Sequence, residues 1–324
     1  MPRGARLDAP GTLHHVIVRG IEKRKIVKDN QDRRHFVSRM GRVATKTETS
    51  IYAWALMKNH AHILVRSGAA GLPAFMRKLL TGYAVTYNLR HRRHGHLFQN
   101  RYKSIVCEED AYFRELVRYI HLNPIRAGVL NKLSQLDRYP WCGHGALLGY
   151  AENDWQDVDY VLKWFGRKLG GARRKYRKYI KRGLKQGHRP DLVGGGLIRS
   201  AGGWSAVKGL RRTGELRKGD ARILGSSDFV EKMIKESDLR RRYQFAADDV
   251  LEKVSALIHE ECGKREVSVS AVKAGSRARD ISKLRADVAP ILINEFGLSH
   301  AESARQLGIS TSAISKIIER HYKS

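Results

Sequence analysis

The sequence predicts a protein of α+β class, followed by a basic connector and an all-α C-terminal domain. Over residues 1–148, short β-branched runs alternate with stretches of helical periodicity. Residues 149–240 are rich in glycine and basic side chains, and residues 241–324 show helical periodicity. A chain of 324 residues is long enough for two or three domains, each with its own hydrophobic core.

Four short segments of the first domain predict strands. Residues 13–20 contain a β-branched run that ends at a glycine. Residues 50–57 and 61–65 are both apolar and are separated by only a few residues, which predicts a tight hairpin. Residues 97–107 predict the fourth strand.

Helices are predicted between and after these strands. Residues 29–47 open with Asp29 and Asn30 as N-cap candidates and then place apolar residues at helical spacing. Residues 72–92 and 110–130 have the same periodicity, and Pro124 marks a break in the latter. The order β-α-β-β-α-β, with an added helix, matches the split-βαβ, ferredoxin-like arrangement. One face of such an antiparallel sheet can pack on helices while the other meets a ligand.

The middle of the chain is expected to be a connector with some helix. Residues 166–189 carry eleven Lys or Arg and no acidic residue. The run is either a solvated linker or a surface that follows phosphates, and the sequence leaves both readings open. Residues 192–209 are glycine-rich but lack the Lys-Ser/Thr pair of a phosphate-binding loop.

The C-terminal domain, residues 241–324, ends in a predicted helix-turn-helix. Ser299 is placed to cap the first helix, Gly308 to end it, and Ser310 or Thr311 to cap the second. The start of the second helix would face base edges in a major groove. The side chains there are Thr311, Ser312, Ser315 and Lys316. A plain three-helix core is the alternative, and the net charge favours DNA binding.

The charge of the chain points to a polyanionic partner. Lys and Arg total 62 against 32 Asp and Glu, which gives a net charge of +30. A nucleic acid is the first expectation, and an anionic membrane surface is the rival. The sequence has no long apolar run and no isolated basic amphipathic helix, so we expect no membrane partner. Three widely spaced cysteines and the lack of a signal peptide predict a cytoplasmic, nucleoid-associated protein.

Two histidines at the start of a predicted strand are candidate metal ligands. His60 and His62 are two residues apart, so both side chains would project from the same face of the strand. Neutral imidazoles bind divalent metal ions. A pair of histidines on a solvated sheet face is the simpler alternative.

The helix predicted after the fourth strand carries a candidate nucleophile. Tyr119 and Asn123 are four residues apart, hence on one helix face. An amide oxygen suits Mg²⁺ or Mn²⁺, and a tyrosine hydroxyl can attack phosphorus to give a covalent intermediate. The alternative for Tyr119 is a tyrosine that only packs on the sheet.

Four segments of residues 6–148 resemble the successive motifs of the REP-associated tyrosine transposases, which are relatives of the single-tyrosine HUH transposases. The segments are 10–20, 57–65, 95–104 and 112–130. On this resemblance His60 and His62 match the metal pair, and Tyr119 matches the nucleophile. Asn123 matches a polar third ligand that is often glutamine in relatives.

The resemblance implies a metal-dependent endonuclease and strand transferase for single-stranded DNA hairpins. Tyr119 would keep a 5′-phosphotyrosine and release a 3′-hydroxyl, with Mg²⁺ or Mn²⁺ as cofactor. Whether the site forms within one chain or across a homodimer is left open. The candidate DNA contacts in or beside the motifs are Arg19, Lys58, Arg101, Lys103, Arg118 and Arg126.

Residues 276–318 are similar to the DNA-binding domain of the bacterial replication initiator DnaA, which implies a duplex DNA partner. Arg279, Lys283 and Arg285 fall in the basic loop and following helix of that domain. The initiator's Arg-Asp-His signature is replaced by residues 308–312, so its box specificity is not expected.

Two other functions compete with the enzyme. One is a catalytically silent DNA-binding regulator or architectural protein. The other is an RNA-binding protein, because Tyr176 and Tyr179 are interleaved with basic residues. Retention of His60, His62 and Tyr119 together favours the enzyme, since binding alone requires none of them.

Overall fold

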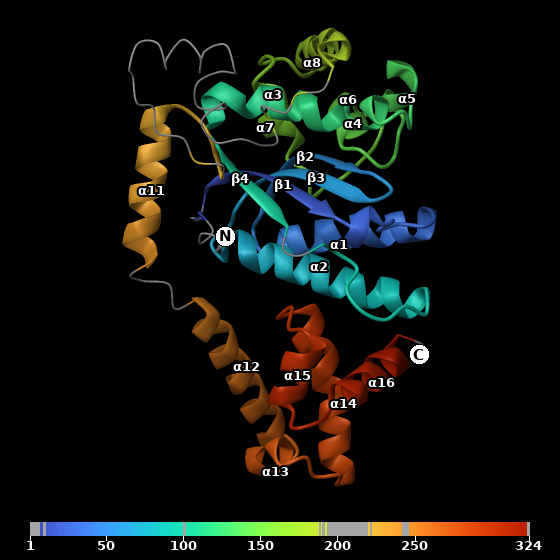
Figure 1. Ribbon diagram of the computed structural model, residues 1–324, viewed down its shortest axis with the longest axis vertical. Helices are drawn as coiled ribbons and strands as arrows, with labels where there is room; N and C mark the ends of the chain where they lie inside the picture. The colour runs from blue at the N-terminus through green and yellow to red at the C-terminus, as the bar shows by residue number, and fades with distance from the viewer. Residues whose placement is uncertain are drawn as a thin grey trace. The chain divides into compact units, whose positions relative to one another are not determined.

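The computed structural model describes residues 7–8, 11–99, 102–187, 189, 192, 220, 222–241 and 246–322. The chain divides into two compact units (Figure 1). The first unit comprises Met1–Phe75 and His96–Leu239, and the second comprises Met76–Gly95 and Arg240–Ser324. Within the described residues, no helix is both long and apolar enough to cross a membrane.

A mixed five-stranded sheet forms the centre of the first unit, with strand order β2-β3-β1-β4-β5. The strands are β1 (Leu13–Arg19), β2 (Ser50–Leu56), β3 (His60–Arg66), β4 (Lys103–Cys107) and β5 (Ile223–Leu224). β1 pairs antiparallel with both β3 and β4, and β2 pairs antiparallel with β3. β5 pairs parallel with β4. The predicted fourth strand is shorter than expected, because Phe98 makes only an isolated bridge to Gly20.

Helix α1 (Asn30–Lys46) lies on one face of this sheet (Figure 1). It begins where predicted, because the Asp29 side chain accepts a hydrogen bond from the Asp32 backbone N–H at 3.0 Å. Phe36 and Met40 lie one turn apart and are both fully buried. The short helix η1 (Ile21–Lys23) joins β1 to the segment before α1. Helix α2 (Gly71–Arg90) begins in the first unit, and its residues from Met76 onward belong to the second.

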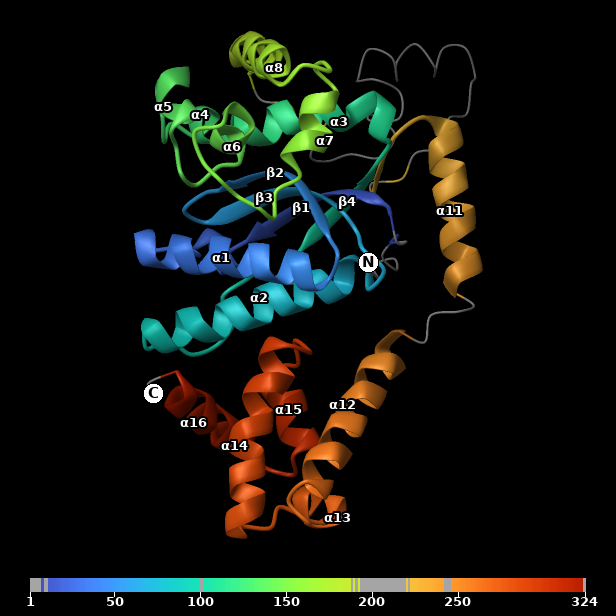
Figure 2. The same cartoon turned by 180° about the vertical axis from the view of Figure 1, so that it is seen from behind.

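Helix α3 (Glu109–His121) covers the opposite face of the sheet (Figures 1 and 2). Its apolar side, with Phe113, Leu116 and Ile120, shares a core with the inward side chains of β2 and β3. The helix breaks at Leu122, close to the predicted break near Pro124. It restarts as α4 (Asn123–Arg126), because a proline is tolerated in the first turn of a helix.

Further helices extend the core on the side of α3. These are α5 (Leu133–Asp137), α6 (His144–Leu148), α7 (Val158–Lys163) and α8 (Leu169–Gly183). The basic run forms α8, and Ala172, Tyr176 and Ile180 give that helix a buried face at four-residue spacing. The short helix η2 (Leu184–Gln186) follows α8, and α11 (Ser227–Arg241) follows β5. Part of the segment expected as a connector therefore builds the first unit.

The second unit is helical. It contains α12 (Ala246–Gly263), α13 (Val269–Lys273), α14 (Arg279–Asn294), α15 (His300–Gln306) and α16 (Thr311–His321), together with the later part of α2. Ser299 and Ser310 cap α15 and α16 through their side chains, as the sequence indicates. Gly308 has φ +63°, and a Cβ there would lie 2.2 Å from the Lys273 carbonyl oxygen. Glycine is therefore required at the turn between α15 and α16.

Candidate active site

The two candidate metal ligands lie at the start of β3, on the face of the sheet covered by α3. His62 is opposite Ile17 of β1 and Ala55 of β2, and His60 is opposite Arg19. Because directly opposed residues of antiparallel strands share a face, Arg19 projects on the same side as the histidines. Lys103 of β4 is opposite Ile17 and projects there as well. The register thus brings two predicted DNA contacts to the face that carries the histidine pair.

Tyr119 reaches this histidine pair from α3. Its ring meets the His62 ring edge-on, with 5.8 Å between the centroids, and the His60 and His62 rings are 5.2 Å apart. Both His62 and Tyr119 are 5% exposed. The structure therefore gathers the predicted nucleophile and the predicted metal pair into one cluster, in which Tyr119 and His62 are buried and His60 is half-buried.

Burial keeps both imidazoles in the neutral form that binds metal ions. Burial and the positive charge of Arg19 lower the pKa of His60 to about 4. The pKa of His62 is lowered well below its usual value, mainly by burial and also by the neighbouring His15, His60 and Arg19. At neutral pH neither histidine carries a proton that a metal ion would have to displace.

The hydrogen bonds of His60 direct one ring nitrogen toward a ligand. The Asn59 amide nitrogen donates to the Lys23 carbonyl oxygen at 3.1 Å, which fixes the orientation of the amide. Its Oδ1 therefore faces His60 Nδ1 at 2.7 Å and accepts the proton there. Nε2 of His60 is left as the lone-pair nitrogen. This arrangement fits a metal ligand.

Asn123 occupies a different element from the one predicted. It is the first residue of α4 rather than the last turn of α3, because the helix is interrupted at Leu122. The residue is 9% exposed, and its Nδ2 has no hydrogen-bond partner among the described residues. A buried donor without a partner is costly, and this one suits a hydrogen-bond acceptor such as a phosphate oxygen, whereas a metal ion would take Oδ1 of the amide.

His15 was not among the residues predicted from the sequence, yet it belongs to the cluster. The residue is fully buried, and its ring stacks on His62 with 5.2 Å between centroids. Its ring also lies edge-on to Tyr119 at 5.9 Å. Alternation along β1 puts His15 on the same face as Ile17 and hence as His62. The sequence contains this signal only if the β1–β3 register is known.

Arg126 and Arg118, two of the predicted DNA contacts, have different environments. The Arg126 guanidinium lies over the Tyr119 ring, 5.1 Å from its centroid, and donates to the Tyr119 carbonyl oxygen at 3.1 Å. Arg118 is 6% exposed, pairs with Glu115 at 2.5 Å and lies over the Tyr179 ring at 4.2 Å. Arg126 therefore adjoins the candidate nucleophile, whereas the charge of Arg118 is engaged within the unit.

The remaining predicted DNA contacts are mostly on the surface. Arg19, Lys58 and Lys103 are exposed in the first unit, and Arg101 lies outside the described residues. In the second unit the exposed side chains are Arg279, Lys283, Thr311, Ser312 and Lys316, and Ser315 is half-buried.

Arg285 has an internal role in the second unit. It is 4% exposed, and its guanidinium donates to the carbonyl oxygens of Leu307 at 2.9 Å, Val272 at 2.6 Å and Ser276. These bonds join the ends of α13 and α15 to α14. The side chain therefore differs from the exposed Arg279 and Lys283, which can reach a phosphate.

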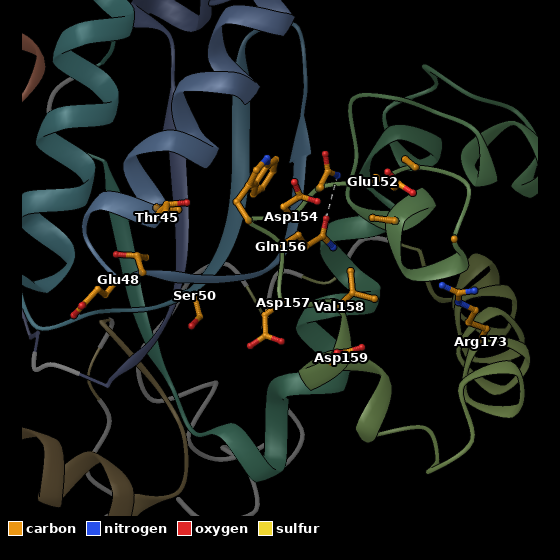
Figure 3. Close-up of a pocket in the computed structure, with 17 residues that line it drawn as sticks. Thr45, Glu48, Ser50, Glu152, Asp154, Gln156, Asp157, Val158, Asp159 and Arg173 are labelled. Carbon is orange, nitrogen blue, oxygen red and sulfur yellow. Dashed lines mark hydrogen bonds between the residues drawn. The ribbon is translucent and has the colours of Figure 1, made fainter.

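A separate cleft of about 690 Å³ lies at the opposite end of the β2–β3 hairpin (Figure 3). Ser50, which lines it, is paired with Arg66 at the end of β3 remote from His60. The acidic residues that line it are Glu48, Glu152, Asp154, Asp157 and Asp159. None of the predicted site residues lines this cleft.

Comparison with known proteins agrees with the resemblance seen in the motifs. Residues 11–123 match the family described as "Transposase IS200 like". No curated protein matches the chain. A solved structure of a REP-associated tyrosine transposase bound to a REP hairpin is 18% identical, with a TM-score of 0.39. The match covers 49% of this chain and 93% of that one. The segment that contains His15, His60, His62, Tyr119 and Asn123 is thus similar to the IS200-like transposases.

Proposed function

We propose that this protein is a metal-dependent endonuclease and strand transferase for single-stranded DNA that folds into hairpins. The observation that best supports this proposal is the position of Tyr119 beside the His60–His62 pair, with 5.8 Å between the centroids of the Tyr119 and His62 rings. These residues lie within the segment that matches the IS200-like transposases. The proposal thus joins a transposase-like sequence to a site that holds a hydroxyl nucleophile beside two neutral imidazoles.

His60, His62 and Asn123 are the residues that would hold a Mg²⁺ or Mn²⁺ ion. Such an ion neutralises a non-bridging phosphate oxygen when bound. Tyr119 attacks the scissile phosphorus, so a bond forms between its phenolic oxygen and phosphorus while the bond to the 3′-oxygen breaks. The proton of the phenol is lost, and the leaving strand gains one as a 3′-hydroxyl. The DNA remains joined as a 5′-phosphotyrosine, and the reverse reaction rejoins strands without ATP.

Basic residues on the same face of the sheet would guide the DNA strand to Tyr119. Arg19 and Lys103 project there by register, Lys58 is exposed in the β2–β3 turn, and Arg126 lies over the Tyr119 ring. Phosphate contacts of this kind increase the affinity for DNA and fix its position on the protein, but they do not select its sequence. We propose that these basic residues bind the single strand beside the scissile phosphate.

The proposed organisation places the chemistry in residues 1–148, most of which form one compact unit with part of the 149–240 segment, and duplex binding in residues 241–324. The antiparallel order β2-β3-β1-β4, with α1 on one face, is consistent with a ferredoxin-like variant that gains β5 at one edge. Helices α15 and α16 would serve as the helix-turn-helix, with α16 in a major groove. The expected location is the cytoplasm, on the nucleoid.

Covalent trapping tests the proposed reaction. The full chain would be mixed with labelled single-stranded hairpins from the flanks of its own gene and Mn²⁺, then resolved on a denaturing gel. We expect a metal-dependent protein–DNA adduct that is lost in Tyr119→Phe and in His62→Ala. Tyr112→Phe, also on α3, is the matched control and should keep the adduct.

Two outcomes would contradict the proposal. An adduct that persists in Tyr119→Phe would assign the nucleophile to another residue. Tight hairpin binding by the wild type without any adduct would favour the catalytically silent regulator. Competition between DNA and RNA hairpins at matched salt would identify an RNA-binding protein, because phosphate contacts depend strongly on ionic strength.

A further inference from the structure

We propose that His15 is a positioning residue that fixes the tautomer of His62 and so presents His62 Nε2 to the metal ion. The proposal rests on the proposed function in one respect, namely that His62 is a metal ligand. His15 itself is not assigned as a ligand. Its contribution is the hydrogen bond that it makes to the far side of the His62 ring.

A continuous line of hydrogen bonds supports this assignment. Nδ1 of His15 is 3.2 Å from the Leu192 carbonyl oxygen, and Nε2 of His15 is 3.0 Å from Nδ1 of His62. A carbonyl oxygen only accepts, so His15 Nδ1 must carry the proton. In a neutral ring His15 Nε2 is then an acceptor, and His62 Nδ1 must donate to it. A neutral His62 with a proton on Nδ1 has its lone pair on Nε2, the nitrogen left for the ion.

The burial of both rings makes this proton order strongly preferred. His15 is 0% exposed and His62 is 5% exposed, so water does not compete for the bonds. Reversing the order would place the His15 Nδ1 lone pair against the Leu192 carbonyl oxygen, or two lone pairs between the rings. Either arrangement leaves buried polar atoms unsatisfied, which is costly in a low-dielectric interior.

Both candidate ligands are therefore oriented in the same manner. His60 Nδ1 is held by Asn59, whose amide is anchored on the Lys23 carbonyl oxygen. His62 Nδ1 is held by His15, whose ring is anchored on the Leu192 carbonyl oxygen. Each relay begins at a backbone carbonyl and ends at an Nε2 lone pair. Partners of this kind orient metal-binding histidines and raise their affinity for the ion.

Metal binding without DNA provides the first test. Binding of Mn²⁺ to the full chain would be followed by electron paramagnetic resonance, which separates free from bound ion. His15→Phe keeps a buried aromatic ring but removes the acceptor, and we expect about 10- to 100-fold weaker binding. His15→Gln restores an acceptor and a donor in one side chain and should recover most of the affinity.

The matched control is His14→Phe. His14 is the neighbouring, equally buried histidine of β1, but it projects from the other face and bonds to Asp8 Oδ1 at 3.0 Å. Its replacement should leave the Mn²⁺ affinity within about twofold of the wild type, since the changed side chain lies on the face of the sheet opposite to the ligands. Equal losses in His14→Phe and His15→Phe would reduce the role of His15 to packing and overturn the proposal.

The tautomer of His62 is read directly in the metal-free wild type by ¹⁵N NMR of the imidazole nitrogens. The proposal requires the proton on Nδ1, and a proton on Nε2 overturns it even if the His15 variants fail to fold. A failure of the proposed function would give a different result. His62→Ala would then bind Mn²⁺ as tightly as the wild type, although His62 of the wild type carried its proton on Nδ1.

Discussion

The surroundings of the histidine pair, in addition to its spacing, favour the neutral form that the proposed metal binding requires. A solvated histidine has a pKa of about 6.5 and would begin to lose a metal ion to protons just below neutral pH. His60 is different, because burial and the charge of Arg19 lower its pKa to about 4. His62 shifts in the same direction for the same main cause.

This shift predicts the pH dependence of metal affinity. A histidine binds the ion only when it is deprotonated, so affinity is retained above the pKa and lost as the pH falls through it. We expect nearly constant Mn²⁺ affinity from pH 8 to about 6 and a decline toward the His60 pKa of about 4. Paramagnetic resonance titrations at a series of pH values would measure it.

Arg19→Gln is the informative control for the pH profile. It removes the cationic neighbour but not the burial, so the decline should shift to higher pH without vanishing. A wild-type profile that already falls near pH 6.5 would show that the two histidines are solvated when they bind the ion.

At the scale of elements, α8 holds the C-terminal end of α3 through a buried hydrogen-bond network. The Tyr176 hydroxyl lies 2.8 Å from His121 Nδ1 and 2.6 Å from His144 Nδ1. His144 Nε2 donates to Asp137 at 3.0 Å, so a neutral His144 accepts the Tyr176 proton, and His121 donates to the Tyr176 oxygen. Burial raises the pKa of Tyr176 well above its usual value, which keeps this hydroxyl protonated. His121 lies between Tyr119 and Asn123 in the chain, so the network anchors the helix end that carries the site.

Tyr176→Phe should therefore destabilise the first unit. Two buried imidazole nitrogens lose their partner, and each such loss costs about 1–3 kcal/mol. We expect a lower unfolding midpoint in urea together with reduced adduct formation, because the Tyr119 backbone loses its support. Tyr150→Phe, at a tyrosine that is 57% exposed, should change the unfolding free energy by less than about 0.5 kcal/mol. Equal stability of Tyr176→Phe and the wild type would show that the network does not support α3.

Elements with local signals were predictable from the sequence, and elements that depend on distant pairing were not. The Asp29 cap and the hairpin that became β2 and β3 are local patterns, and both were found where expected. β5 is only two residues long and exists because Ile223 pairs with Val106 far away in the chain. His15 escaped prediction for a similar reason, because its proximity to His62 follows from the register between β1 and β3.

The basic run shows how charge can obscure a helix. Lysines and arginines dominate residues 166–189, which favoured a connector. The buried Ala172, Tyr176 and Ile180 nevertheless recur at helical spacing and pack in the core with α3. Apolar periodicity is therefore a better indicator of the structure of this segment than its composition, from which we expected a connector with some helix.

At the scale of the whole molecule, the proposed function assigns the two units to two different DNA structures. The first contains the candidate nucleophile and its histidines, and the second presents exposed Arg279 and Lys283 on α14 and exposed Lys316 on α16. Whether the two units have separate roles cannot be tested by simply deleting residues 240–324. Val85 and Leu89 of α2 pack in the core of the second unit, so the deletion would expose apolar surface on a helix that remains.

Point substitutions in the full chain avoid this problem. Arg279→Gln combined with Lys316→Gln should weaken binding to duplex DNA and lower the slope of log affinity against log salt by about 1–2, one for each lost phosphate contact. Formation of the Tyr119 adduct on a single-stranded hairpin should be unchanged. Fluorescence anisotropy at several salt concentrations measures the duplex affinity, and the denaturing gel measures adduct formation.

Lys253→Gln, which replaces an exposed lysine on α12, serves as the control for charge alone. An unchanged salt slope in the double variant would exclude these two side chains as phosphate contacts, whereas loss of the adduct would mean that the second unit also delivers the hairpin to Tyr119.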